Sequence, residues 1–251
     1  MSATWVIAWR EANSILHQRR MLVFAVGFGV IIPLFAGGVF IGVIARLSSV
    51  IGLGNVGHLH ASLRVTGVKG LTQSLLVWLG IFPILFSAQF AAIAFAAERE
   101  RRSLPALLAT PASLGAIITG KLLASLAPGL ITVVASYSVY VSSVEAATPE
   151  AASWLPIETV VAAGLFLAAL SLLVNGAALL ISTRSRTVVG ASSTVTFVSL
   201  PVSIATALFA LALSTLPAIA VVGAAIGVAG LAAFVVYAGA VSWRRGEILA
   251  N

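Results

Sequence analysis

The chain has 251 residues, of which 60% are apolar and 8% are charged, and its mean hydropathy is +1.12. Soluble domains carry about 25% charged residues, so this chain has too few charges to cover the surface of a soluble domain. It is also too apolar to be disordered. The net charge of +7 comes from short clusters of Lys and Arg between apolar runs, which argues against nucleic-acid binding. The absence of cysteine excludes thiol catalysis, disulfides and thiolate metal sites. We therefore expect an all-α polytopic membrane protein.

Residues 4–20 are predicted to form an amphipathic helix before the first span. At about 100° per residue, one face of this helix is apolar. That face contains Trp5, Trp9, Ala12 and Leu16, with Ala8 and Ile15 beside it. Because Trp prefers the headgroup level of a bilayer, we expect an interfacial helix that is anchored by its two Trp side chains and leads through Arg19 and Arg20 into the first span. The alternative is a basic leader that only sets the topology.

Six segments are apolar enough to cross a bilayer, whose hydrocarbon core requires about 20 residues per helix. The long uncharged run 187–243 divides into two spans at Ser214–Pro217, because Pro cannot continue a helix. The expected spans are approximately 21–45, 71–97, 122–144, 159–183, 191–213 and 218–241. The run 103–120 is shorter, contains Pro105 and Pro111, and is expected to lie at the membrane surface.

The distribution of Lys and Arg predicts the orientation of these spans. With the N-terminus inside, eleven of the fourteen cations are cytoplasmic: Arg10, Arg19, Arg20, Arg99, Arg101, Arg102, Lys121, Arg184, Arg186, Arg244 and Arg245. The other three are Arg46, Arg64 and Lys69. Both termini are therefore expected to be cytoplasmic in a multi-pass protein of the cell membrane. The outer loops 46–69, 145–158 and 214–217 are too short to fold separately, so residues 1–251 are expected to form one transmembrane domain.

Residues 98–120, the coupling segment, combine a charge cluster with a short apolar helix. The cluster is Glu98, Arg99, Glu100, Arg101 and Arg102. Ser103 can cap the following helix, whose apolar stripe is Leu104, Leu107 and Leu108, and Thr110-Pro111 ends it. This combination favours docking onto a cytoplasmic partner, with Glu98 and Glu100 facing that partner. The alternative is a solvated, positively charged loop, which does not explain the two Glu residues.

Two short motifs resemble sites but lack essential groups. Gly115–Lys121 nearly fits a phosphate-binding loop, but Leu122 replaces the hydroxyl residue that holds Mg²⁺, and the chain has no Asp. Lys121 is instead expected to anchor the third span by reaching the inner headgroups. His58 and His60 could lie on one side of an extended loop, but two His residues without a third ligand make a weak metal site. We expect no metal and no nucleotide on this chain.

Several polar side chains occur within the apolar runs. They are Gln73, Gln89, Ser136, Tyr137, Tyr140, Asn175, Thr194 and Thr196. They could line a translocation path or form hydrogen bonds between helices, and the sequence leaves both interpretations open. The motifs Gly38–Gly42 and Gly223–Gly227 could contact a partner subunit, but such motifs more often pack helices within one bundle.

The coupling segment resembles the loop after the second span of ABC-2-type permeases, the membrane subunits of ATP-binding-cassette exporters. The matching positions are Glu98, Glu100, Leu104, Leu107, Leu108, Thr110, Pro111, Gly120 and Lys121. Six spans, cytoplasmic termini, an N-terminal elbow helix and the basic C-terminal Arg244–Leu249 also resemble this family. Two features depart from some members: the first outer loop is short, and little room remains for a hairpin between the last two spans. Polysaccharide and sterol substrates are therefore not expected.

The resemblance implies a permease subunit that moves a substrate out of the cytoplasm and is not itself an enzyme. ATP and Mg²⁺ would be bound by a separate ATPase subunit, and a second permease copy or a paralogue would complete the transporter. The scarcity of charges within the spans favours a hydrophobic or amphipathic substrate. The alternatives are a gradient-driven carrier or channel without an ATPase, and a membrane scaffold. A carrier usually requires a carboxylate within the membrane, and no acidic residue lies in the middle of a span.

Overall fold

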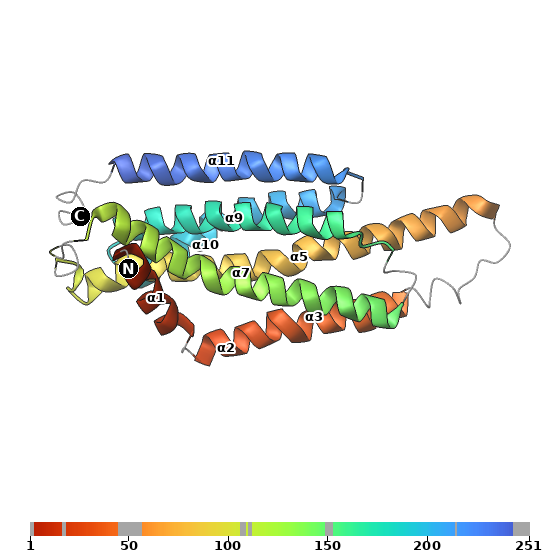
Figure 1. Ribbon diagram of the computed structural model, residues 1–251, viewed down its shortest axis with the longest axis horizontal. Helices are drawn as coiled ribbons and strands as arrows, with labels where there is room; N and C mark the ends of the chain where they lie inside the picture. The colour runs from red at the N-terminus through yellow and green to blue at the C-terminus, as the bar shows by residue number, and fades with distance from the viewer. Residues whose placement is uncertain are drawn as a thin grey trace.

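The computed structural model describes residues 3–16, 19–44, 57–105, 109, 112–148, 153–213 and 215–242. These residues form helices and short connections, with no strand among them (Figure 1). Six helical segments within them are long and apolar enough to span a membrane: Val23–Ile44, Gly67–Glu100, Leu114–Ala147, Ile157–Arg184, Val188–Ala212 and Ala218–Gly239. The prediction of an all-α protein with six spans is confirmed.

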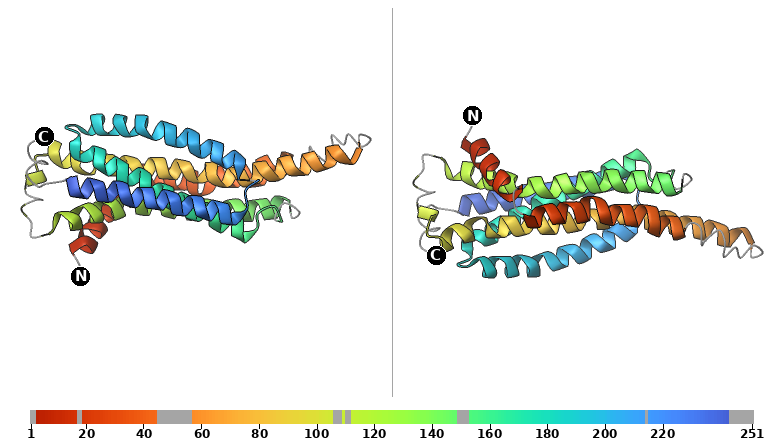
Figure 2. Two further views of the ribbon diagram at one scale, coloured as in Figure 1. Left: turned by 90° about the horizontal axis from the view of Figure 1, so that it is seen from above. Right: turned by 90° about the horizontal axis from the view of Figure 1, so that it is seen from below.

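Helix α1 (Ala3–Leu16) precedes the first span and lies across the bundle rather than along it (Figures 1 and 2). The first span is a succession of α2 (Arg19–Val26), η1 (Gly27–Ile31), α3 (Ile32–Leu34) and η2 (Phe35–Ile41). The other spans are the long helices α5 (Gly57–Glu100), α7 (Leu114–Ala147), α9 (Ile157–Arg184), α10 (Val188–Ala212) and α11 (Ala218–Ser242).

The first span changes between α-helical and π-helical turns around Pro33. Proline lacks the N–H that a regular helix would donate, so the backbone around it adjusts its hydrogen bonding. The span packs along α7, and the approach is closest at Gly37. A Cβ on Gly37 would lie 2.9 Å from the carbonyl oxygen of Tyr140, so only glycine permits this contact.

Helices α5 and α9 form the centre of the bundle. Helix α9 packs against α5 and α11 most extensively, α7 and α10 pack against α5, and the first span covers the outer side of α7. The core between α5 and α9 contains small residues such as Ala88, Ala92 and Ala163, all fully buried. Small side chains let helices approach closely in a membrane, where packing replaces the hydrophobic effect between helices.

Two boundaries differ from the sequence-based expectation. Helix α5 begins at Gly57 and has 44 residues, about 66 Å of helix, whereas residues 46–69 were expected to be a loop. It extends beyond the rest of the bundle at one end (Figure 1). Helix α7 begins at Leu114, so the last part of the coupling segment belongs to the spanning helix and not to a surface segment.

One end of the bundle is called the Arg-rich end, because the elements that meet there carry most of the described arginines (Figure 1). Helix α1, the end of α5, the start of α7 and the α9–α10 connection meet there. The arginines of this end are Arg10, Arg19, Arg99, Arg101, Arg102, Arg184 and Arg186. Lys69 lies near the start of the second span, Gly67–Glu100, whose other end belongs to the Arg-rich end.

Candidate functional site at the Arg-rich end

Helix α5 ends with a hydrogen-bonded C-cap. Arg102 adopts the left-handed conformation with φ of 55°. The Ser103 N–H donates to the carbonyl oxygen of Glu98 at 2.9 Å, and the Arg102 N–H donates to that of Arg99 at 3.0 Å. This is the Schellman arrangement, in which the left-handed position is usually glycine. The cap turns the chain sharply and buries Leu104, which is 3% exposed, in the core beneath the turn.

Three of the five charges in the cluster bind to neighbouring spans. The Arg99 guanidinium donates to the backbone carbonyls of Thr183 and Ser185 at the end of α9. The Glu100 carboxylate accepts the Val188 N–H at 2.7 Å, at the start of α10, where the helix dipole favours an anion. Glu98 thus binds within the bundle, whereas Glu100 is exposed as well as bound to the start of α10. That these two carboxylates face a partner stays a prediction.

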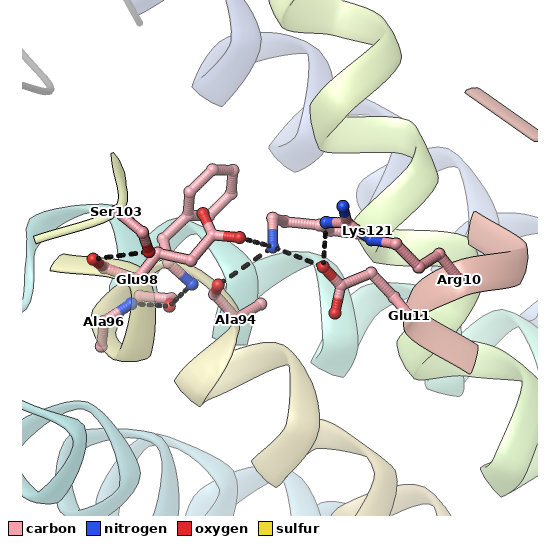
Figure 3. A network of polar contacts seen from close by, with 9 residues as sticks. Arg10, Glu11, Ala94, Ala96, Glu98, Ser103 and Lys121 are labelled. Carbon is pink, nitrogen blue, oxygen red and sulfur yellow. Dashed lines mark hydrogen bonds and ion pairs between the residues drawn. The ribbon is translucent and has the colours of Figure 1, made fainter. Parts of the chain in front are cut away.

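Lys121 is the centre of a buried polar group, the Lys121 cluster, that joins three helices (Figure 3). Its Nζ donates to Glu98 Oε1 at 2.8 Å, to the Ala94 carbonyl oxygen at 3.1 Å, and to Glu11 Oε1 at 3.3 Å. Its side chain is 2% exposed. It also lies 5.2 Å from the ring centroid of Phe95, within the range of a cation–π interaction. Each of the three ammonium N–H groups thus has an acceptor, and the side chain links α7 to α5 and α1.

The expected role of Lys121 as a headgroup anchor is wrong. Gly115–Lys121 lies within α7, where its side chain is enclosed by protein, so it cannot extend to the lipid surface. Its two carboxylate partners make the buried position tolerable, because an unpaired charge would be far more costly there.

Next to the Lys121 cluster, the backbone of α5 also forms hydrogen bonds with a side chain of α9. The Phe95 and Ala96 N–H groups both lie within hydrogen-bond distance of Ser182 Oγ, at 2.9 and 3.2 Å (Figure 3). Ser182 is on α9 and fully buried. One hydroxyl therefore fixes the last turns of α5 against α9, opposite the side that Lys121 fixes against α7.

Gly120 explains why α1 can approach α7 at this point. A Cβ on Gly120 would lie 3.0 Å from the Ile7 Cβ and 3.0 Å from the Thr4 carbonyl oxygen. Gly120 removes the steric barrier to α1, and Lys121 supplies the ion pair that holds it. The apparent phosphate-loop motif is therefore a helix-packing motif followed by a buried cation.

The other predicted anchors are Trp5, Trp9, Arg19 and Arg20. Trp5 and Trp9 are 52% and 64% exposed and stack with ring centroids 6.4 Å apart. Ala8, on another face of α1, is buried. Arg19 is exposed at the start of α2, and the side chain of Arg20 lies outside the described part. The Trp pair thus faces away from the bundle while the opposite side of α1 packs against it.

The surface part of the coupling segment is only partly described. Arg101, Arg102, Ser103 and Pro105 are exposed. The predicted residues Leu107, Leu108, Thr110 and Pro111 lie outside the described residues. The structure therefore places two exposed arginines directly after the three charges that bind the bundle.

The polar residues within the spans do not gather in one place. Some bind between helices: Tyr140 Oη donates to the Thr72 carbonyl, Gln73 Nε2 donates to that of Trp154, and Asn175 Nδ2 donates to Ser87 Oγ. Tyr137 and Ser136 are buried, and their hydroxyls have no partner in the described part of the chain. A second group faces outward at the α5–α10 contact, where Gln89 bonds to Ser192 and Thr196, with Thr194 exposed nearby.

The two glycine motifs differ in their surroundings, and the two His residues lie on a helix. Gly42 packs against Ala147, so Gly38–Gly42 contacts α7, whereas Gly223 and Gly227 have open space around them. His58 and His60 belong to helix α5 and not to an extended loop.

Glu11 and Ser182 are the site residues that the sequence analysis missed. Glu11 is one of only seven acidic residues, and a cation near the start of a span requires a nearby acid. Because acidic residues are so few, Glu11 could have been predicted as a partner of Lys121. Ser182 had no comparable signal, because Ser is common in these spans and only the packing of α9 on α5 assigns its role.

Residues 2–226 match the sequence model of the family described as ABC-2 type transporter. This match covers α1, the coupling segment, the Lys121 cluster and the first five spans, and it extends into α11. A search of curated proteins finds none that matches.

Proposed function

Because the chain belongs to the ABC-2 type transporter family, whose members are membrane subunits of transporters, we propose that it is the permease of an exporter driven by a separate ATPase. The observation that carries the proposal is the family match over residues 2–226 on a chain with six potential spans. ATP and Mg²⁺ would be bound by the ATPase. The backbone N–H groups of Gly115–Lys121 are part of helix α7, which does not form the cradle that phosphates require.

The coupling segment is the proposed docking site for the ATPase. Its exposed residues Arg101 and Arg102 directly follow Glu98, Arg99 and Glu100. Those three bind α7, α9 and α10 respectively. A displacement of the exposed part would therefore be transmitted to three spans through hydrogen bonds, without a flexible linker between them. This arrangement suits the transfer of motion from an ATPase to the membrane helices.

A second permease copy is proposed to cover α10 and the adjoining part of α5. The outer face of α10 exposes apolar side chains such as Phe197, at 78%, beside Thr194, Thr196 and the half-buried Gln89. Polar groups facing lipid are unfavourable. Polar groups facing another subunit or a water-filled path are not. The space between two copies would thus suit an amphipathic substrate.

The Arg-rich end is proposed to be cytoplasmic, with the protein in the cell membrane. The test is Ser103→Cys, which places one thiol in a chain without cysteine at an exposed position. In intact cells, a membrane-impermeant maleimide is expected to label it only after the membrane is opened. Thr215→Cys, exposed in the α10–α11 connection, is the matched control and is expected to react in intact cells. The reverse pattern would contradict the orientation.

A further inference from the structure

Three of the long spanning helices contain a proline within their length. These are Pro83 in α5, Pro128 in α7 and Pro201 in α10, whereas the sequences of α9 and α11 contain none. A proline inside a helix removes one backbone N–H donor and crowds the carbonyl four residues earlier, so the helix is kinked or weakened at that turn. Helix α10 is visibly curved (Figure 2).

Pro83 and Pro128 lie at the same depth in the bundle. A Cβ on Gly129, the residue after Pro128, would lie 3.2 Å from the Pro83 carbonyl oxygen and 2.6 Å from Ser87 Oγ. Both prolines are buried. Each of the two helices therefore has its weakest turn directly beside that of the other.

Pro201 lies at this depth as well. Two contacts between the antiparallel helices α5 and α10 bracket it: Gln89 with Thr196, and Ile81 with Thr206, which line the same small space. Pro83 lies between the α5 members of these two contacts, and Pro201 lies between the α10 members. The three prolines thus form one layer across α5, α7 and α10, which we call the proline layer.

On the Arg-rich side of the proline layer, polar side chains bind the helices to one another. Lys121 joins α7 to α5, and Glu100 joins α5 to the start of α10. Ser182 and Arg99 join α9 to α5. These parts of four helices are the Arg-rich body. Because α9 has no proline, it continues this body through the layer as an uninterrupted helix.

The other side of the proline layer has polar bonds of its own. Tyr140 Oη donates to the Thr72 carbonyl oxygen at 2.9 Å and joins α7 to α5. Thr206 of α10 is buried and lines a space with Ile81 of α5. The parts of α5, α7 and α10 on this side are the outer body.

At the layer itself, α5 and α9 are joined at one point beside Pro83. Asn175 of α9 is fully buried. Its Nδ2 donates to Ser87 Oγ at 3.0 Å and to the Ser171 carbonyl oxygen at 2.9 Å. A bond at a single point fixes the distance between two helices there, but it leaves the angle between them free to change.

We propose that the proline layer is a hinge, across which the Arg-rich body moves against the outer body. Bending occurs in α5, α7 and α10 at their prolines, α9 moves with the Arg-rich body, and the Ser87–Asn175 bond is the pivot. A few positions absorb the change in backbone angles, while the packed segments on either side stay rigid. The hinge belongs to this chain alone, and it stands whether or not an ATPase binds the coupling segment.

The test is pulsed electron paramagnetic resonance in lipid nanodiscs, with pairs of nitroxide-labelled cysteines in this chain without cysteine. The label positions are exposed: Thr119 and Ser142 on α7, Val189 and Leu211 on α10. Dilution with unlabelled chain restricts the measurement to distances within one copy. Thr119/Val189 and Ser142/Leu211 each lie within one body, whereas Ser142/Val189 crosses the layer. We expect a broader spread of distances for the crossing pair. Equal spread in all three pairs would overturn the hinge.

Proline variants locate the bending at the layer. Combined Pro83→Ala, Pro128→Ala and Pro201→Ala are expected to narrow the spread of the crossing pair to that of the pairs within one body, because each helix regains an N–H donor. The mean distances of the pairs within one body are expected to stay the same, which shows that the variant keeps its fold. An unchanged spread of the crossing pair in the triple variant would contradict the hinge.

Pro33→Ala is the matched control. Pro33 lies in the first span, where its carbonyl oxygen accepts from Ser143 Oγ. Ser143 is about 22 Å along α7 from Pro128, so Pro33 is outside the proline layer. We expect Pro33→Ala to leave the spread of the crossing pair unchanged. Narrowing equal to that of the triple variant would show that the bending is not set by the layer.

Discussion

Lys121 is the residue on which the Arg-rich end depends most directly. Its side chain is 2% exposed and is paired with two carboxylates from different helices. Replacing a whole buried ion pair by apolar side chains of the same shape can leave the stability of a protein unchanged. Removing only one partner leaves a buried charge without a counterion, which is strongly destabilising. We therefore expect single substitutions in this cluster to be more harmful than paired ones.

Lys121→Met is expected to destabilise the protein by about 3 kcal/mol, because Glu98 and Glu11 lose their shared cation. The double variant Lys121→Met with Glu98→Gln is expected to recover part of this loss, since it removes the unpaired charge as well. Thermal unfolding in detergent measures both. Lys69→Met, at the opposite end of the second span, is the control. Additive losses in the double variant would show that the ion pair is not coupled.

Arg102 occupies the left-handed position of the α5 C-cap, where most residues are strained by about 1 kcal/mol and glycine is not. Arg102→Gly is expected to raise the unfolding temperature slightly. Arg101→Gly, one residue earlier, is expected to lower it, because the Arg101 N–H still bonds to the Ala97 carbonyl as in the helix and glycine weakens helices by about 1 kcal/mol. The same direction of change in both variants would contradict the assigned cap.

For single residues, the sequence shows which side chains are unusual but not which groups they bind. The charge cluster at residues 98–102 was recognisable as unusual in a chain with 8% charged residues. The directions of its side chains were not, because Arg99 and Glu100 bind backbone groups of α9 and α10. Those partners are more than eighty residues away, and only the packing of the spans brings them into contact.

At the scale of helices, the contact between α1 and α7 is set by one glycine. Gly115 lies on the same helix but has open space around its Cβ position, whereas Gly120 faces Ile7 and Thr4 at 3.0 Å. The two glycines therefore form a natural comparison: the cost in helix propensity is the same, and only one of them contacts α1.

Gly120→Val is expected to displace α1 from α7, because its Cβ and methyl groups would overlap Ile7. Trypsin cleavage after Arg10 and Arg19 in the purified protein should then be several times faster than in the unaltered chain. Gly115→Val should be cleaved at the normal rate. Equal cleavage of the two variants would mean that α1 is not held at Gly120.

The order and number of the helices could be predicted from the sequence, but several boundaries could not. Apolar runs and interrupting charges located six spans, because a bilayer core requires about 20 apolar residues per helix. Lys69 and Arg64 suggested that α5 begins later, yet the helix starts at Gly57, since cations are compatible with a helix that projects beyond the membrane. Lys121 likewise suggested the start of a span, although burial with Glu98 keeps it inside the α7 helix.

At the scale of the whole molecule, the Arg-rich end and the membrane bundle form one connected unit. Helix α5 binds α7 through Lys121, α9 through Arg99 and Ser182, and α10 through Glu100. A rigid connection of this kind would let the proposed permease subunit respond to nucleotide bound by the proposed ATPase. It also predicts that the exposed Arg101 and Arg102 contact the ATPase, whereas Glu98, which binds Lys121, does not.

The most direct measurement is Mg-ATP hydrolysis that copurifies with the tagged chain from its native membranes. We predict hydrolysis with the unaltered chain and with Lys69→Glu, and its loss from the double variant Arg101→Glu with Arg102→Glu at equal recovery of the permease, because reversed charge opposes docking. No hydrolysis with the unaltered chain, or full hydrolysis with the double variant, would contradict an ATPase bound at the coupling segment. Saturable Mg-ATP binding by the isolated chain that Lys121→Ala abolishes would contradict the division into two subunits.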